Sequence, residues 1–369
     1  MQIRRDPGKE CMNRQLTIYA GPKALQHIRD KGLSQEDVSV IAGAAGGPKW
    51  LVLNHLDRMI FSSWLNGRKK PLYLLGSSIG SWRFAAVSQK DPMAAMDRFQ
   101  YSYIRQAYKT KPDPREVSRI ISRILDDFLN DNGIREILAH PFFRLNIMAV
   151  QCRHVMASDH KAILGPGLLA AALLNMIRRD FLKFFFKRAF FYHPGEKPPF
   201  FNMSGFPIEK TILTEQNLRK ALLASGSIPL VMEGVMDIPG ISPGMYRDGG
   251  ILDYHFDIDF SDQNSGLVLY PHYTDRMIPG WLDKKLPFRK PCPGNMENVI
   301  LLAPSQDFLN RLRYRKIPDR NDFFLFKNQD KARISYWLSV INESRRLADD
   351  FGDAVESGRI RELAKPMPI

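Results

Sequence analysis

The chain has 369 residues, of which 44% are hydrophobic and 25% are charged, so it can bury a sizeable core. This composition is ordinary for a globular protein and excludes an intrinsically disordered chain. Lys and Arg outnumber Asp and Glu by 53 to 39, a formal net charge of +14, so the chain attracts anionic partners such as nucleic acid or anionic lipid surfaces.

The cysteines and the apolar stretches indicate the cellular compartment of the protein. Cys11, Cys152 and Cys292 show no CxxC spacing, which argues against a disulfide framework or a zinc site and favours a reducing compartment. The first ten residues lack the apolar run of a secretory signal, and the weakly charged stretch 162–177 is shorter than the about 20 residues of a spanning helix. We expect a cytoplasmic protein, able to associate peripherally with membranes; non-classical export stays open.

Strands and helices alternate along the first part of the chain. The β-branched run at 38–42 predicts a strand, which enters the glycine-rich loop 43–49 and then a helix at 50–62 with apolar residues at helical spacing. A second strand at 72–75 is followed in the same way by a glycine turn and a helix at 81–88.

The later elements continue this alternation. Asp91-Pro92 and Asp113-Pro114 each place a capping carboxylate before a proline, so helices are expected at 93–109 and 115–129. The remaining expected elements are strands at 145–151, 266–270 and 299–303 and helices at 215–224 and 328–356. Short buried strands separated by helices predict an α/β fold with a mostly parallel sheet. In such a sheet, catalytic and binding residues lie at the carboxyl ends of the strands.

A possible nucleophile follows the second strand. Gly76-x-Ser78-x-Gly80 has the spacing of a nucleophile elbow, in which a tight strand-to-helix turn exposes a serine hydroxyl. The two glycines remove Cβ atoms that this turn would bring into contact. The alternative is a serine cap at an ordinary turn, because this short motif is common by chance.

Two further glycine motifs accompany the serine. The loop Gly46-Gly47-Pro48-Lys49 follows the first strand, and Trp50 stands where a phosphate-binding P-loop needs Ser or Thr. Asp248 precedes Gly249 and Gly250, which permit a sharp turn, although a plain Asp-Gly turn is the simpler explanation. The expected oxyanion-hole donors are the N–H groups of Gly46, Gly47, Lys49 and Ile79.

Together these motifs resemble the patatin-like phospholipases. The resemblance is carried by 46–49, 76–80 and 248–250, and by the small-residue segment 224–229 that ends in Ile-Pro, and it spans about 36–255. It implies a three-layer α/β/α sandwich. The whole chain would be one catalytic domain with a core at about 36–305, an aromatic and basic helical insertion at about 165–195 and a C-terminal helical extension at about 306–369.

The resemblance also implies a mechanism. Ser78 would attack a lipid ester, of phospholipid type, after Asp248 accepts its proton, and water would hydrolyse the acyl-enzyme; no metal or organic cofactor is implied. The chain departs from the family at Trp50 and Ala45, where glycines are usual, and this bears on the shape of the oxyanion loop. The alternatives are a catalytically inactive lipid-binding member, a Ser-His-Asp esterase that uses His255 or His272, and a basic nucleic-acid-binding protein.

The segment 168–192 interleaves aromatic and basic residues. A helical projection separates a basic side from an aromatic side, which predicts a lid or a helix that docks on an anionic membrane surface carrying the lipid substrate. Packing on the protein's own core is the alternative. The candidate residues are Phe181, Phe184, Phe185, Arg178, Arg179 and Lys183. The sequence contains no nucleic-acid-binding motif, so no nucleic acid partner is expected.

Overall fold

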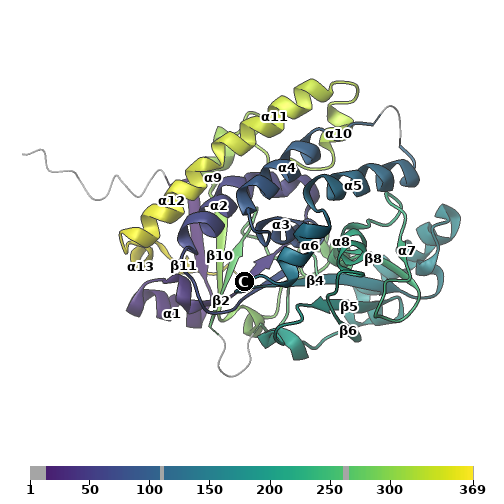
Figure 1. Cartoon of the computed structure of the whole chain (residues 1–369), viewed down its shortest axis with the longest axis horizontal. Coiled ribbons are helices and arrows are strands. Elements are labelled where there is room, and N and C mark those ends of the chain that lie inside the picture. The colour runs from purple at the N-terminus through teal and green to yellow at the C-terminus, as the bar shows by residue number, and fades with distance from the viewer. Residues whose placement is uncertain (1–13, 109–111, 261–265, 369) are drawn as a thin grey trace, which may run out of the picture.

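A mixed, mostly parallel β-sheet runs through the centre of the molecule (Figure 1). The computed structural model describes residues 14–108, 112–260 and 266–368. Outside these ranges lie the last residue of the helix expected at 93–109, Cys11, and the first ten residues that were considered as a secretory signal. Within them the sheet has 11 strands, in the order β11-β1-β10-β9-β2-β3-β4-β5-β6, and β8 pairs with β4 and with β7. The strands are β1 Leu16–Ala20, β2 Val38–Gly43, β3 Leu72–Ser77, β4 Phe143–Cys152, β5 Phe186–Tyr192, β6 Ile208–Ile212, β7 Val235–Met236, β8 Met245–Asp248, β9 Leu267–Pro271, β10 Val299–Pro304 and β11 Lys365–Pro366.

Helices pack on this sheet and on one another. Helix α3 contacts β2, β3 and β4, α8 contacts β4, and α12 contacts β1 and α2. The arrangement is α/β and compatible with a three-layer sandwich. The helices are α1 Pro22–Lys31, α2 Asn54–Met59, α3 Ile79–Val87, α4 Pro92–Ile104, α5 Pro114–Phe128, α6 Asp131–Leu138, α7 Lys161–Ile177, α8 Leu218–Gly226, α9 Gln306–Arg311, α10 Asp322–Leu325, α11 Asp330–Glu343, α12 Arg345–Glu356 and α13 Ile360–Leu363.

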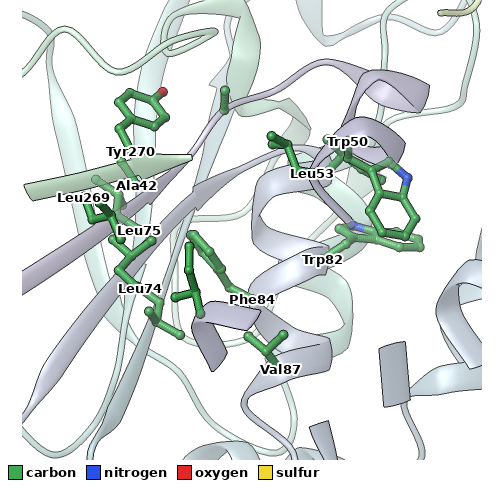
Figure 2. Close-up of a cluster of buried hydrophobic side chains, with 14 of the residues drawn as sticks. Ala42, Trp50, Leu53, Leu74, Leu75, Trp82, Phe84, Val87, Leu269 and Tyr270 are labelled. Atoms are coloured by element: carbon green, nitrogen blue, oxygen red, sulfur yellow. The ribbon is translucent and has the colours of Figure 1, made fainter. Parts of the chain in front are cut away.

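The central strands are parallel and buried. The neighbours β9-β2-β3-β4 all run in the same direction, so β2 and β3 end at the same edge of the sheet. Their side chains form a core with α3 and with the segment after β2, as Figure 2 shows for Leu74, Leu75, Leu269, Phe84 and Trp82. A continuous apolar strand pattern of this kind is what burial on both faces requires.

Most of the expected elements are present. The strands expected at 38–42, 72–75, 145–151, 266–270 and 299–303 are β2, β3, β4, β9 and β10. Both expected caps are confirmed, since Asp91 accepts a hydrogen bond from the Ala94 N–H at 2.9 Å and Asp113 from the Glu116 N–H at 2.8 Å. The helix expected at 50–62 is instead a 3₁₀ turn, Gly47–Leu53, followed by α2 and a π-helical turn, Ile60–Trp64.

The helical interpretation of the aromatic and basic segment is wrong beyond residue 177. Helix α7 ends at Ile177, a 3₁₀ turn covers Arg179–Phe184, and Phe186–Tyr192 forms strand β5. Strand β5 pairs with both β4 and β6, and Phe190 and Phe191 are fully buried. Pairing on both edges and burial of these rings outweigh the helical spacing of the cations.

Candidate active site

The turn between β3 and α3 holds Ser78 in a strained conformation. Ser78 has φ 55° and ψ −127°, a region that non-glycine residues rarely adopt. Close packing enforces it: a Cβ on Gly76 would lie 2.3 Å from the Ser81 nitrogen, and one on Gly80 would lie 2.1 Å from the Gly43 oxygen. The turn therefore has the geometry of a nucleophile elbow, with the serine side chain directed away from the sheet.

Ser78 and Asp248 are hydrogen-bonded to each other. The Ser78 hydroxyl donates to Oδ2 of Asp248 at 2.8 Å, although the residues are 170 positions apart in the chain. Strand β8 pairs antiparallel with β4 and places Asp248 at its own carboxyl end, opposite Ala149. The other carboxylate oxygen accepts the Gly250 N–H at 2.7 Å. The structure thus brings together the two residues that the motifs singled out.

The environment makes Asp248 a stronger base than an exposed carboxylate. Burial raises the pKa of Asp248 above its usual 3.8, and the nearby Arg320 charge and the hydrogen bonds from Ser78 and Gly250 offset only part of that effect. A raised pKa brings the carboxylate closer to the proton affinity needed to accept the hydroxyl proton.

One short segment holds both residues of the pair. The hydroxyl of Ser225, near the end of α8, accepts the Ser78 N–H at 2.8 Å and donates to the Met148 carbonyl at 2.6 Å. The Ser227 carbonyl accepts the Asp248 N–H at 2.9 Å. The segment 224–229 therefore fixes the backbone on either side of the Ser78–Asp248 contact. The sequence marked this segment only through the family resemblance, with no role attached.

The glycine loop lies at the same edge of the sheet. A Cβ on Gly250 would lie 2.8 Å from the Cβ of Ala45, so the loop adjoins the turn that carries Asp248. No hydrogen bond within the described residues uses the N–H groups of Gly46, Gly47 or Ile79. These three N–H groups therefore have no hydrogen-bond acceptor among the described residues. The structure gives Lys49 a further feature, an ammonium group 3.5 Å from the Tyr254 hydroxyl.

The two departures from the family pattern are accommodated locally. The Ala45 N–H donates to the Tyr254 carbonyl at 3.0 Å, and the Ala45 carbonyl accepts the Tyr273 hydroxyl at 2.6 Å, so both polar groups of this residue are used to fix the loop. The Trp50 ring is 1% exposed and stacks on Phe99 at 4.6 Å between ring centroids. Its bulk therefore fills the core.

The geometry does not support a histidine base. Nδ1 of His255 accepts the Ile278 N–H at 2.9 Å and its Nε2 lies 2.8 Å from the Tyr273 hydroxyl, while Nδ1 of His272 lies 2.6 Å from the Thr274 carbonyl. Burial lowers the pKa of His255 well below 6.5 and that of His272 to about 3. Across residues 14–108, 112–260 and 266–368, neither ring hydrogen-bonds to Ser78 or Asp248.

A small pocket opens beside the pair. Its cavity volume is about 10 Å³, which is room for about one water molecule. Its lining residues come from five separate parts of the chain: Ala45, Ile228, Pro229, Asp248, Gly250, Ile251, Tyr254, Trp281 and Arg320. Trp281 and Arg320 carry no local sequence signal for a site, since the fold brings them to the pocket from distant segments.

The six residues expected at a membrane or lid have different surroundings. Phe184 is 55% exposed and Lys183 is exposed, whereas Phe181 and Phe185 are half-buried. Arg178 is exposed and pairs with Asp180 at 2.9 Å.

Arg179 has a structural role. It is half-buried and pairs with Asp283 at 3.2 Å. The prediction that Arg179 faces a membrane is therefore wrong. Asp283 is fully buried and also accepts the Asn175 side-chain N–H at 2.8 Å. This carboxylate therefore ties the end of α7 to the 3₁₀ turn Trp281–Asp283 on the pocket wall.

No protein-family model matches this chain, and no curated protein matches it. Within the described ranges, no group of three or more His, Cys, Asp and Glu side chains is placed to hold a metal ion. The geometry of the site is therefore the basis for its chemistry.

Removing the Ser225 hydroxyl should misplace the nucleophile. In Ser225→Ala the Ser78 N–H loses its acceptor, so we expect Ser78 to react about 10 to 100 times more slowly with a fluorophosphonate, and the free energy of unfolding to fall by about 1–3 kcal/mol. Ser227→Ala is the matched control, because its hydroxyl bonds only to the Leu223 carbonyl and its own carbonyl still holds Asp248. Equal labelling rates in both variants would contradict the positioning role.

The reactivity of Ser78 should decline in acid. Because the raised pKa belongs to Asp248 acting as a base, the fluorophosphonate rate is expected to be full above that pKa and to fall as pH drops through it, with a midpoint above 3.8. The rate is measured over the range in which circular dichroism shows the native fold. A midpoint at or below 3.8, or a rate that rises in acid, would show that Asp248 is not the base.

Proposed function

We propose that the chain is a patatin-like serine acyl hydrolase that cleaves carboxylic esters of lipids, of phospholipid type, with a Ser78–Asp248 dyad. The observation that carries the proposal is the 2.8 Å hydrogen bond from the strained Ser78 to a buried carboxylate of raised pKa. The unused N–H groups of the neighbouring loop add the second requirement of acyl transfer, stabilisation of an oxyanion.

The reaction follows from this arrangement in two halves. Asp248 accepts the hydroxyl proton while Ser78 Oγ bonds to the ester carbonyl carbon, and the carbonyl oxygen becomes an oxyanion that the N–H groups of Gly46, Gly47 and Ile79 can stabilise by about 3–4 kcal/mol per donor. Collapse breaks the ester bond, and the alcohol leaves with the proton from Asp248. A water molecule then gives its proton to the same carboxylate and attacks the acyl-enzyme, which releases the acid and restores Ser78.

Covalent labelling tests this proposal. A fluorophosphonate should modify the folded protein on the peptide that contains Ser78, and Ser78→Ala should abolish labelling and lower hydrolysis of a short-chain ester by at least about 1,000-fold. Ser62→Ala, at an exposed serine whose hydroxyl contacts only the nearby Arg58 carbonyl and Ser63 hydroxyl among the described residues, is the control and should behave as wild type. A folded wild-type protein that is neither labelled nor active would refute the hydrolase and favour the non-catalytic lipid-binding alternative.

The surface of α7 supports a lipid interface as the place of reaction. Its inner side packs in a second core cluster with residues that include Leu164, Leu168 and Ala171. Its outer side is also apolar, which is unusual for a helix in water. The large apolar side chains exposed on α7 are Ile163, Leu169, Leu173, Met176 and Ile177, each at least 46% exposed.

The α7 face has the charge and the position that an anionic membrane would need. Lys161 at the start of α7 and Lys183 in the 3₁₀ turn that follows it are both exposed. Each cation near an anionic membrane surface contributes about 1 kcal/mol to binding. At the pocket, Ile228 and Pro229 in the lining continue into Leu230 and Val231, which are 39% and 40% exposed. None of the described helices is long and apolar enough to cross a membrane.

Vesicle binding tests the α7 face. Leu173→Ser combined with Ile177→Ser removes two side chains that would enter the lipid, so the partition coefficient on phosphatidylglycerol vesicles should fall at least about tenfold. Leu325→Ser combined with Phe324→Ser on α10 is the matched control, since those residues are 68% and 76% exposed outside the α7 face. Unchanged binding by a folded α7 double variant would sink the docking role.

A further inference from the structure

Three cationic side chains gather around the pocket beside Ser78. Arg320 lines the pocket together with Asp248, and a Cβ on Gly47 would lie 3.2 Å from its guanidinium Nε. Lys284 follows the pocket-lining Trp281 by three residues and places its ammonium 4.0 Å from the centre of the Tyr254 ring. Lys49 also approaches Tyr254, with its ammonium 3.5 Å from the hydroxyl.

These half-buried cations lack the carboxylate partners that several other cations in the molecule have. Arg83 is paired with Asp57, Arg188 with Asp253 at 2.7 Å, and Asp283 receives both Arg179 and Arg289. Among the described residues, no ion pair involves Lys49, Lys284 or Arg320. Positive charge in a partly buried site without a counter-ion is unfavourable, so this cluster calls for an anion.

The neighbouring ionisable groups respond to the same field. Burial would raise the pKa of the Tyr254 phenol, but Lys49 and Lys284 outweigh burial and lower it. Burial lowers the pKa of Lys284, and the positive charges of Arg320 and Lys49 lower it further. Asp248 is the one acidic side chain in the lining of the pocket, and it is committed to Ser78 and to the Gly250 N–H.

We propose that Arg320 and Lys284 form a subsite for a phosphate group that the substrate carries close to its scissile ester. The inference rests on the proposed function and specifies its substrate. Arg320 offers a planar fork of donors suited to two phosphate oxygens, and Lys284 supplies a second positive charge. The pocket is small and contains both Arg320 and Asp248, so the phosphate must be separated from the ester by only a few bonds.

The subsite would select for one class of ester. A monoacylated glycerol phosphate places its phosphate a short distance from the ester and meets this requirement, whereas a neutral acylglycerol leaves the three cations without a counter-ion. If Arg320 instead stabilised the oxyanion of the reacting carbonyl, it would act on neutral and anionic esters alike. The two roles therefore differ in the ratio of the rates for two matched substrates.

Kinetics on a matched pair of esters test the subsite. The substrates are 1-butyryl-glycerol and 1-butyryl-glycerol 3-phosphate, and wild type is expected to show the higher kcat/KM on the phosphate ester. That preference should fall at least about tenfold in Arg320→Gln and in Lys284→Gln. Lys285→Gln, which removes an exposed neighbouring charge, should keep the wild-type preference. An unchanged preference in Arg320→Gln, or a parallel loss on both substrates, overturns the subsite.

Direct binding separates this inference from the proposed function. Calorimetry with glycerol 3-phosphate should show binding to Ser78→Ala that weakens at least about tenfold when Arg320→Gln is added. This binding without hydrolysis of either ester would refute the hydrolase and support the subsite. Hydrolysis without this Arg320-dependent binding would refute the subsite alone. Inorganic phosphate that binds as tightly as glycerol 3-phosphate would identify a site for free phosphate and overturn the substrate assignment.

Discussion

The close contact between the start of α3 and the ends of β2 and β3 is the constraint on which the site depends. Gly80 packs against the Gly43 carbonyl with no room for a Cβ, and this forces the chain through the strained conformation at Ser78. Such strain persists only where the surroundings over-determine it. Here the Ser225 hydroxyl holds the Ser78 backbone, and the same segment holds Asp248 through the Ser227 carbonyl. Packing shapes the turn that holds the buried Ser78 side chain, and hydrogen bonds keep it aligned with Asp248.

How far the sequence predicts this molecule depends on the range of the interactions that decide each feature. Strands β2 and β3 and the caps at Asp91 and Asp113 follow from local residue patterns, which is why their positions could be predicted. Strand β5 could not, because the cations before and within it fall at helical spacing, whereas its pairing with β4 and β6 decides its structure. The glycine motifs and Ser78 and Asp248 carried a signal in the sequence. Arg320 and Lys284 carried none, since only the folding back of the C-terminal part brings them to the pocket.

The positive charge of the chain is used in two different ways. In the interior, cations such as Arg83 and Arg188 meet buried carboxylates in paired hydrogen bonds, and these pairs fix the elements that carry them. Near the pocket, Lys49, Lys284 and Arg320 have no such partners among the described residues; Lys49 and Lys284 approach the Tyr254 side chain, and Arg320 lines the pocket. The first arrangement satisfies charge within the fold, and the second is the basis of the proposed phosphate subsite. A surplus of basic residues therefore need not mean nucleic acid.

Asp283 connects the outer surface of the protein to the wall of the pocket. On one side it binds Asn175 and Arg179 at the end of α7, and on the other it belongs to the turn that carries Trp281 and precedes Lys284. A shift of α7 would consequently move an aromatic wall and an ammonium group next to the nucleophile, through a single carboxylate. In the proposed hydrolase, adsorption of α7 on a lipid surface would therefore change the shape of the pocket through this one side chain.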